Sequence, residues 1–251
     1  MPTTTPLPLE IKPSPLDSNR FGVPIGRAAL YAPEHVGQAL AYCRENALQM
    51  LIVRCGVEHL PTVQALEAAG GRLMDTIVTY AIKLKDNPPP PDDPADPLRV
   101  RLGRPEDAPI MAEITGEAFR GFYGHYHADP RLDPRKADAG YEEWGGRCFS
   151  VPGVSDVNYV AEYAGEPVGY YALRRVDQEV SEGVISAVRP AMQGKGIFRR
   201  LMQHAMAWGW SIGTTRMLMA TLINNLATQK AVVRLGFEPA FAHYTFHWWL
   251  D

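Results

Sequence analysis

The chain has 251 residues, enough for one large domain or two modest domains that each bury a core. Apolar residues make up 46% and charged residues 21%, an ordinary soluble globular composition, and the formal net charge is -3. This balance predicts neither a nucleic-acid surface nor an anionic-membrane surface, so we expect no nucleic-acid partner and no membrane partner.

The cysteines and the first residues bear on the compartment. Cys43, Cys55 and Cys148 are far apart, odd in number and form no CxxC pair, which is typical of buried thiols in a reducing compartment. Residues 1–15 show no basic-then-apolar leader pattern. No apolar run approaches the roughly 18 residues that span a membrane. The expected compartment is the cytoplasm.

Residues 1–87 have the pattern of a small α/β domain. Apolar spacing predicts strands at residues 21–28, 51–53 and 75–84, with helices at 33–46 and 60–69 between them. A Gly-Gly pair at 70–71 ends the second helix.

A proline-rich segment follows at residues 88–97. Stacked prolines fix φ and remove backbone donors, so this stretch is expected to be an extended, semi-rigid linker. It separates the N-terminal unit from a larger domain at residues 98–251.

The larger domain starts with a strand and two helices and then becomes rich in strands. Strands are expected at residues 98–102, 157–163, 167–175, 180–188, 216–221 and 242–250. Helices are expected at 105–119, 137–148, 196–210 and 226–235, with a loop-rich stretch at 120–140. Ala164-Gly165-Glu166 predicts a hairpin turn between the second and third strands.

The most informative stretch is residues 188–201, where a strand ends at Arg189-Pro190 and a glycine-bearing turn opens a long helix. Gly194 and Gly196 allow close backbone approach, and the first helical amides have no intrahelical acceptor. The positive end of the helix dipole lies behind them, which suits a pyrophosphate. A Gly-x-Gly turn before a helix is also common as a simple strand-to-helix connection.

This stretch resembles the acyl-CoA pyrophosphate loop of the GNAT N-acyltransferases, whose pattern is Gln/Arg-x-x-Gly-x-Gly/Ala. Gln193 and Gly196 match the pattern, whereas Phe198 stands where a small residue is usual. Downstream, residues 225–230 and Leu235-Gly236-Phe237 resemble the second CoA-side motif of the family, in which Asn225 caps a helix. The resemblance covers roughly residues 99–251.

The resemblance implies an α/β fold of the GNAT acyl-CoA N-acyltransferase type, a mixed, mostly antiparallel sheet flanked by helices. The smaller N-terminal α/β domain, from its element order, is expected to be a reduced unit of similar architecture. The implied cosubstrate is acetyl-CoA or another short acyl-CoA, with a small amine as acceptor; a homodimer is left open. The implied cofactor-binding residues are Val188, Gln193, Gly194, Lys195, Gly196, Ile197, Phe198, Arg199 and Asn225.

For catalysis, the resemblance implies that an acceptor amine attacks the thioester directly. Two parallel strands part near Val188, whose backbone N–H would stabilise the oxyanion. The family's usual acid, a tyrosine in the helix before Gly-Phe, corresponds to Val232, which cannot donate a proton. Tyr244 or His247 could supply it, or the thiolate could leave unassisted because a thiol pKa is about 8.5. Packing for Tyr244, and acyl-CoA binding without catalysis, are the alternatives.

Residues 123–129 contain His125, His127 and Asp129 at alternate positions, a spacing that can resemble a metal site. No further Cys/His cluster supports a metal, so none is expected. In the family this segment borders the acceptor site, where aromatic and hydroxyl groups suit a sugar or a base; a solvated surface loop is the alternative.

Short stretches at residues 16–25 and 243–249 are similar to two-domain amino-sugar acyltransferases of the dTDP-fucosamine acetyltransferase type. This narrower resemblance favours a nucleotide-linked amino sugar as acceptor. An antibiotic, a polyamine or a protein N-terminus stays open as another amine.

Overall fold

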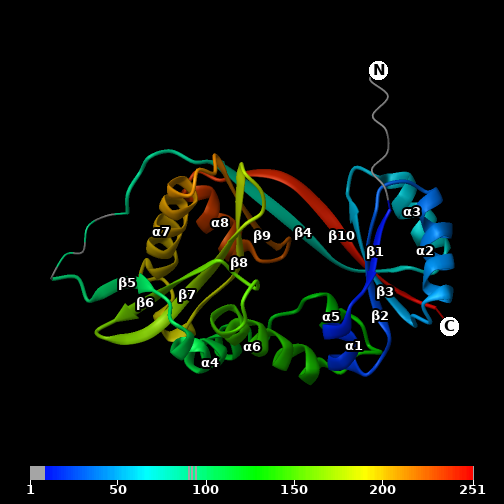
Figure 1. Cartoon of the computed structure of the whole chain (residues 1–251), viewed down its shortest axis with the longest axis horizontal. Coiled ribbons are helices and arrows are strands. Elements are labelled where there is room, and N and C mark those ends of the chain that lie inside the picture. Colours follow the sequence, from blue (N-terminus) through cyan, green and yellow to red (C-terminus); the bar gives the residue numbers. More distant parts are fainter. Residues whose placement is uncertain (1–8, 90, 92, 94, 251) are drawn as a thin grey trace, which may run out of the picture.

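The computed structural model describes residues 9–89, 91, 93 and 95–250 (Figure 1). Within them the strands form one ten-stranded sheet in the order β1-β2-β3-β10-β4-β9-β8-β7-β6-β5. Neighbouring strands are antiparallel except at the β2–β3 and β8–β9 pairs. The expected mixed, mostly antiparallel sheet is therefore confirmed.

The N-terminal elements are β1 (Glu10–Pro13), α1 (Pro15–Phe21), β2 (Ile25–Leu30), α2 (Glu34–Glu45), β3 (Met50–Gly56), α3 (Leu60–Ala68) and β4 (Arg72–Lys83). The strand expected at 21–28 was wrong at its start. Pro15 opens a short helix that ends at Gly22, where a φ of 75° turns the chain before β2 begins at Ile25.

The remaining elements are β5 (Leu98–Leu102), α4 (Ala108–Ala118), α5 (His125–Ala128), α6 (Pro134–Ser150), β6 (Val157–Tyr163), β7 (Glu166–Arg175), β8 (Val180–Val188), α7 (Ile197–Ser211), β9 (Arg216–Leu222), α8 (Leu226–Arg234) and β10 (Glu238–Trp249). The hairpin between β6 and β7 is confirmed. Its turn residues Ala164 and Gly165 have φ values of 52° and 86°, as a type I′ turn requires. The loop expected at 120–140 contains the short helix α5 and the first turns of α6.

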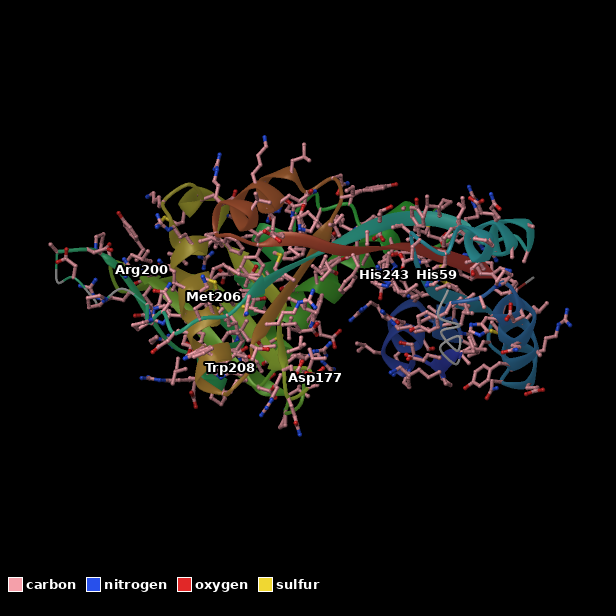
Figure 2. All side chains as sticks on the ribbon, turned by 90° about the horizontal axis from the view of Figure 1, so that it is seen from above. His59, Asp177, Arg200, Met206, Trp208 and His243 are labelled. Carbon is pink, nitrogen blue, oxygen red and sulfur yellow. The ribbon has the colours of Figure 1, made fainter. Side chains whose placement is uncertain are left out.

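Two strands join the N-terminal and C-terminal halves. β4 and β10, of 12 residues each, run side by side through both parts of the molecule, and β10 lies between β3 and β4 (Figure 1). In Figure 2, His59 and His243 mark the N-terminal half, and Arg200, Met206 and Trp208 mark α7 at the other end. Residues 90, 92 and 94 of the expected linker lie outside the described residues, and the division into two domains stays a prediction.

Helices cover both faces of the sheet. On one face of the C-terminal half, α7 and α8 bury Leu201 and Val232 against β7, β9 and β4. On the other face, α4 and α6 cover Tyr170 and Ala172 of β7. These two helices approach closely at Gly145, where an added Cβ would lie 2.0 Å from a side-chain oxygen of α4.

Side chains of β10 alternate between two environments in the N-terminal half. Tyr244, Phe246 and Trp248 pack in the cluster formed with α2 and α3. Thr245 and His247 point to the opposite face, where α5 contacts the sheet.

Candidate functional site

A groove lies where β8 and β9 separate. The two strands pair in parallel only from Val180 to Glu182 of β8, and beyond that point no pairing joins them. The groove, about 1150 Å³ in volume, occupies the fork and is bordered by α8 and by the segment after α4. Its lining includes Val188, Gln193, Gly196, Phe198, Asn225 and Tyr123.

The glycine turn before α7 forms one wall of this groove. Gly194 and Gly196 both have a φ of +79°, a left-handed conformation that L side chains rarely adopt. No acceptor among the described residues pairs with the backbone N–H groups from Gly194 through Arg199, whereas Arg200 N–H returns to the Gly196 carbonyl at 3.0 Å. A row of free amides thus meets the positive end of α7, the arrangement that binds phosphate groups.

Charged and polar side chains around the turn are largely exposed. Lys195 Nζ lies 4.9 Å from the ring centre of Tyr163, and Gln193 Nε2 donates to the Val188 carbonyl at 3.5 Å. Phe198, which replaces the usual small residue, packs partly against the core beside Tyr171 and still lines the groove. The departure from the family pattern leaves the backbone amides of the turn free.

Val188 directs its backbone into the fork. It pairs with Gly169, and the flanking bond runs from Arg189 N–H to the Val168 carbonyl at 2.8 Å. This pattern marks a non-hydrogen-bonded pair, so the N–H of Val188 points away from β7 and toward the gap beside β9. The geometry can accommodate an oxyanion at this N–H.

The second CoA-side segment closes the groove from the other strand. Asn225 caps α8, since its side chain accepts from Thr228 N–H at 3.3 Å, and it also donates to Thr221 Oγ1 at 3.1 Å. Val232 is fully buried on the inner side of α8 and is not among the groove residues. Helix α8 therefore presents no tyrosine to the groove.

The structure does not bring Tyr244 to the groove. Its ring lies edge-on to Phe246, with centroids 6.3 Å apart, in the cluster beneath α2 and α3. The role of Tyr244 as proton donor stays a prediction. Tyr170 and Tyr171 do not line the groove either, because both are fully buried on β7.

The structure does bring together His125, Asp129 and His247, which the sequence placed in two separate stretches. His125 Nδ1 lies 2.8 Å from His247 Nε2, and His247 Nδ1 lies 2.7 Å from Asp129 Oδ2. Trp249 Nε1 donates to the same carboxylate oxygen at 2.8 Å. His247 is completely buried and Asp129 nearly so. We refer to these three residues as the histidine chain.

The environment sets the protonation states of His125 and Asp129, the two ends of the histidine chain. Burial alone would raise the pKa of Asp129, but the hydrogen bonds from His247 and Trp249 outweigh it and hold this pKa below the ordinary value. Burial lowers the pKa of His125 well below its ordinary value, and the nearby Arg54 guanidinium lowers it further. His125 is accordingly neutral near pH 7, and Asp129 is ionised.

Further charges surround the histidine chain. Asp75 on β4 accepts from His125 N–H at 2.9 Å and from the hydroxyl of Thr245, and Arg54 lies 3.8 Å from its Oδ1. On the far side, Arg27 donates to Asp17 at 2.7 Å. Opposite charges therefore compensate one another around a neutral imidazole.

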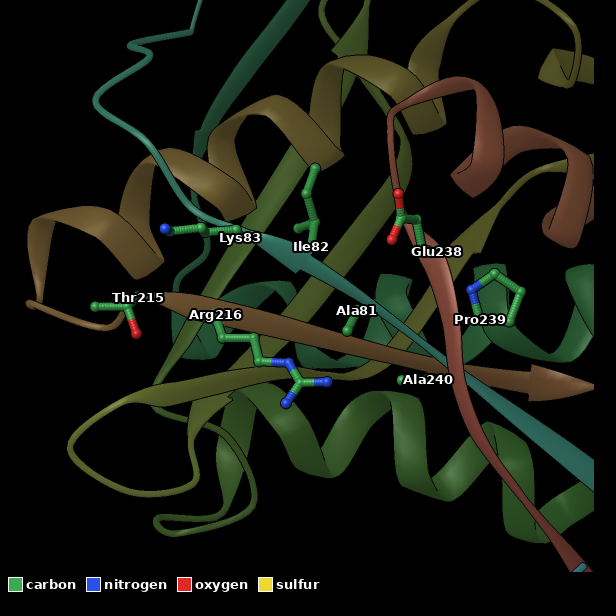
Figure 3. A pocket seen from close by; sticks show the side chains of 8 residues that line it. All are labelled: Ala81, Ile82, Lys83, Thr215, Arg216, Glu238, Pro239 and Ala240. Carbon is green, nitrogen blue, oxygen red and sulfur yellow. The ribbon is translucent and has the colours of Figure 1, made fainter.

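A second, smaller cavity of about 390 Å³ lies at the amino end of β9 (Figure 3). Lys83, Arg216 and Glu238 line it, and no residue expected at the acyl-CoA site does. Across the described ranges, no three His, Cys, Asp or Glu side chains are grouped to hold a metal ion. In that same part of the chain no helix is both long and apolar enough to cross a bilayer.

Comparison with known proteins adds a family to this geometry. The acetyltransferase (GNAT) family model matches residues 117–237, which include the groove's turn and α8. A search among curated proteins gave no match.

Solved structures share the fold at low sequence identity. A GCN5-related N-acetyltransferase from Sphaerobacter thermophilus is 16% identical with a TM-score of 0.62, over 96% of this chain and 76% of that one. A GCN5-related N-acetyltransferase from Kribbella flavida is 15% identical with a TM-score of 0.60, over 89% and 80%. A tandem GNAT protein from the clavulanic acid biosynthesis pathway is 15% identical with a TM-score of 0.59, over 91% and 76%. The chain therefore has the GNAT fold, and its residues 117–237 carry the signature of the acetyltransferase (GNAT) family.

Proposed function

We propose that this chain is an N-acyltransferase that moves an acetyl or other short acyl group from acyl-CoA to a primary amine. The observation that carries the proposal is the row of free amides from Gly194 to Arg199, which opens α7 at the edge of a large groove. Such a row binds a pyrophosphate through the backbone, so it tolerates the change at Phe198.

The fork between β8 and β9 supplies the second element of the mechanism. An acyl-CoA whose pyrophosphate lies at Gly194–Gly196 extends its thioester toward Val188, which lines the same groove. The amine nitrogen attacks the thioester carbon and forms the C–N bond, while the Val188 N–H stabilises the oxyanion. The C–S bond then breaks and releases CoA thiolate, and the acylated nitrogen loses its extra proton to solvent.

Proton donation to the thiolate is the step with the least support from side chains. Val232 carries no proton, and Tyr244 packs under α2 and α3. A thiol pKa of about 8.5 makes the thiolate a tolerable leaving group, so we propose that it departs unassisted and takes its proton from solvent.

We propose acetyl-CoA as donor and a nucleotide-linked amino sugar as acceptor, on the short stretches at residues 16–25 and 243–249. A thiol-release assay with acetyl-CoA against amino sugars, polyamines, aminoglycosides and peptides tests both points. Turnover with a polyamine but not with an amino sugar would refute the acceptor and leave the reaction class intact.

Acyl-CoA binding without catalysis is the second candidate, favoured by Val232 at the usual acid position. Calorimetry separates the two candidates when combined with the thiol-release assay. Micromolar CoA binding together with thiol release supports the enzyme. Tight CoA binding without release from any amine would favour the binding module.

A further inference from the structure

The histidine chain ends in an atom with no partner. Nδ1 of His125 bonds His247, and no hydrogen bond involves its Nε2 among the described residues. That nitrogen is not completely enclosed, although the residue is only 6% exposed. A buried imidazole network that presents one free nitrogen at a surface is arranged to exchange a proton there.

The direction of the hydrogen bonds follows from the charges. Asp129 is ionised and accepts only, so His247 must donate from Nδ1. A His247 that carries only this one proton accepts at its Nε2, and His125 then donates from its own Nδ1. The Nε2 of neutral His125 is therefore left with a lone pair rather than a proton.

The histidine chain shares a face of the sheet with part of the groove lining. Leu222 lines the groove and pairs with Ile77 on β4, so the two side chains point to one face. Asp75, two residues before Ile77, points to this face too, and it holds the backbone N–H of His125. Strand geometry places the Cα atoms of Asp75 and Leu222 roughly 8 Å apart.

The chain segment after α4 gives a second, independent link. Gly121, Phe122 and Tyr123 line the groove, and His125 follows Tyr123 by two residues. The groove wall therefore leads directly into α5. His125 itself does not line the groove, but an acceptor amine bound beside α5 would meet its free nitrogen.

We propose that Nε2 of His125 is the general base that deprotonates the acceptor amine, and that His247 and Asp129 carry the resulting charge away from it. This inference rests on the proposed N-acyl transfer and names its missing base. His125 is the catalytic residue in this scheme, and His247 and Asp129 are positioning residues.

Protons balance along the chain. Nε2 of His125 takes one proton from the ammonium group of the acceptor, which leaves a neutral amine to attack. The Nδ1 proton of His125 passes to Nε2 of His247 across 2.8 Å. His125 is again neutral, and the imidazolium sits on His247 beside the Asp129 carboxylate at 2.7 Å.

This proton transfer moves the positive charge away from Arg54 and Arg27, which disfavour a charge on His125. The positive charge moves to the histidine that has an ionised carboxylate as direct partner, where Coulomb attraction favours it. The groups that face His125 come from several elements: Arg27, Arg54, Asp75, Tyr126, His127 and His247.

A nuclear magnetic resonance measurement tests the lone pair without any turnover. Long-range ¹H–¹⁵N correlation of ¹⁵N-histidine protein at pH 7 should show both His125 and His247 as Nδ1–H tautomers. Spectra of His125→Gln and His247→Gln assign the signals. A His125 signal with the proton on Nε2 would overturn the proposal, because no lone pair would face the amine.

Enzyme kinetics test whether His125 acts as the general base. His125→Gln should lower kcat with the best amine on the order of 100-fold, the usual size of a general base effect. Its Kd for CoA should not change, since the pyrophosphate turn is untouched. His247→Gln should keep part of the activity and shift the acidic limb of the pH–rate profile. His59→Gln, on the N-terminal half, is the matched control and should behave as wild type.

The outcomes separate this inference from the proposed function. Wild-type kcat in His125→Gln would refute the base and leave acyl transfer standing. Absence of CoA binding or of thiol release in the wild type would refute the acyl transfer, and the tautomer measurement still decides whether His125 presents a lone pair. Should His125→Gln fold poorly, His125→Asn provides the second variant.

Discussion

Substitution of Gly196 tests the pyrophosphate turn most directly. In Gly196→Ala the new Cβ meets no atom within 4 Å, so no clash follows, but the φ of +79° forces alanine into the left-handed region. That conformation costs an L residue about 1–2 kcal/mol. For a chain of this size, each kcal/mol lowers Tm by roughly 2–4 °C.

Gly213→Ala provides the matched control. Gly213 follows the other end of α7, has a φ of +83° and likewise has no atom within 4 Å of an added Cβ. We expect both variants to lose the same stability in denaturant unfolding. Any difference in CoA affinity between the two variants therefore reflects contact with the ligand and not backbone strain.

Calorimetric titration with CoA should separate the pair. With a pyrophosphate bound at this turn as proposed, the methyl group of Gly196→Ala adds bulk beside it, so we expect at least one charge-assisted hydrogen bond to be lost. Such a bond contributes about 1.5–3 kcal/mol, which corresponds to roughly a 10- to 150-fold weaker Kd. Gly213→Ala should bind CoA as the wild type does. Equal affinity in the two variants would refute the assignment of this turn to the pyrophosphate.

Four further outcomes follow from the structure. Because burial lowers the pKa of His125, the unfolded state takes up a proton near pH 6.5 and the folded state does not. At pH values below 6.5 the free energy of unfolding should therefore decrease, by up to about 1.4 kcal/mol per pH unit. Denaturant titrations of His125→Gln should show a weaker dependence of this free energy on pH. Gly145→Ala should destabilise the protein by about 1–3 kcal/mol because α4 blocks the new methyl group. Gly37→Ala, at an exposed position in α2, should instead stabilise it by up to about 1 kcal/mol. Destabilisation in both variants would contradict this account. Tyr171→Phe removes a buried hydroxyl that has no partner among the described residues, so Tm should stay or rise; a clear loss would reveal an interaction of that hydroxyl. Tyr244→Phe should keep wild-type kcat if the ring only packs, and a large drop in the thiol-release assay would restore it as the acid.

Periodicity and turn chemistry predicted most of the C-terminal half. The strands around the Ala164-Gly165 turn and the helix after Gly196 came out within a residue or two, because alternation and glycine placement act locally. The helix α1 and the four-residue helix α5 were missed. Both are too short to show a helical period, and α5 is held by contacts with β4 and β10 that are distant in sequence.

The candidate site likewise has one part that the sequence could predict and one part that it could not. The groove's glycine turn could be predicted because one continuous segment forms it. The histidine chain could not, since His125 and His247 are 122 residues apart and only strand β10 brings them together. Both parts were visible in the sequence, as the dense polar segment 123–129 and the histidine on the last strand. No local pattern, however, predicts that these two segments are in contact.

The position of β10 has a consequence for synthesis of the chain. Strand β4 finds its two sheet neighbours only in β9 and β10, which leave the ribosome more than a hundred residues later. Until then its alternating, β-branched segment has two unpaired edges, a state that invites wrong pairing or capture by a chaperone. The sheet of the N-terminal half therefore stays incomplete until the last strand is made. A nascent chain released before residue 238 has the elements of both halves but lacks one of the two strands that join them.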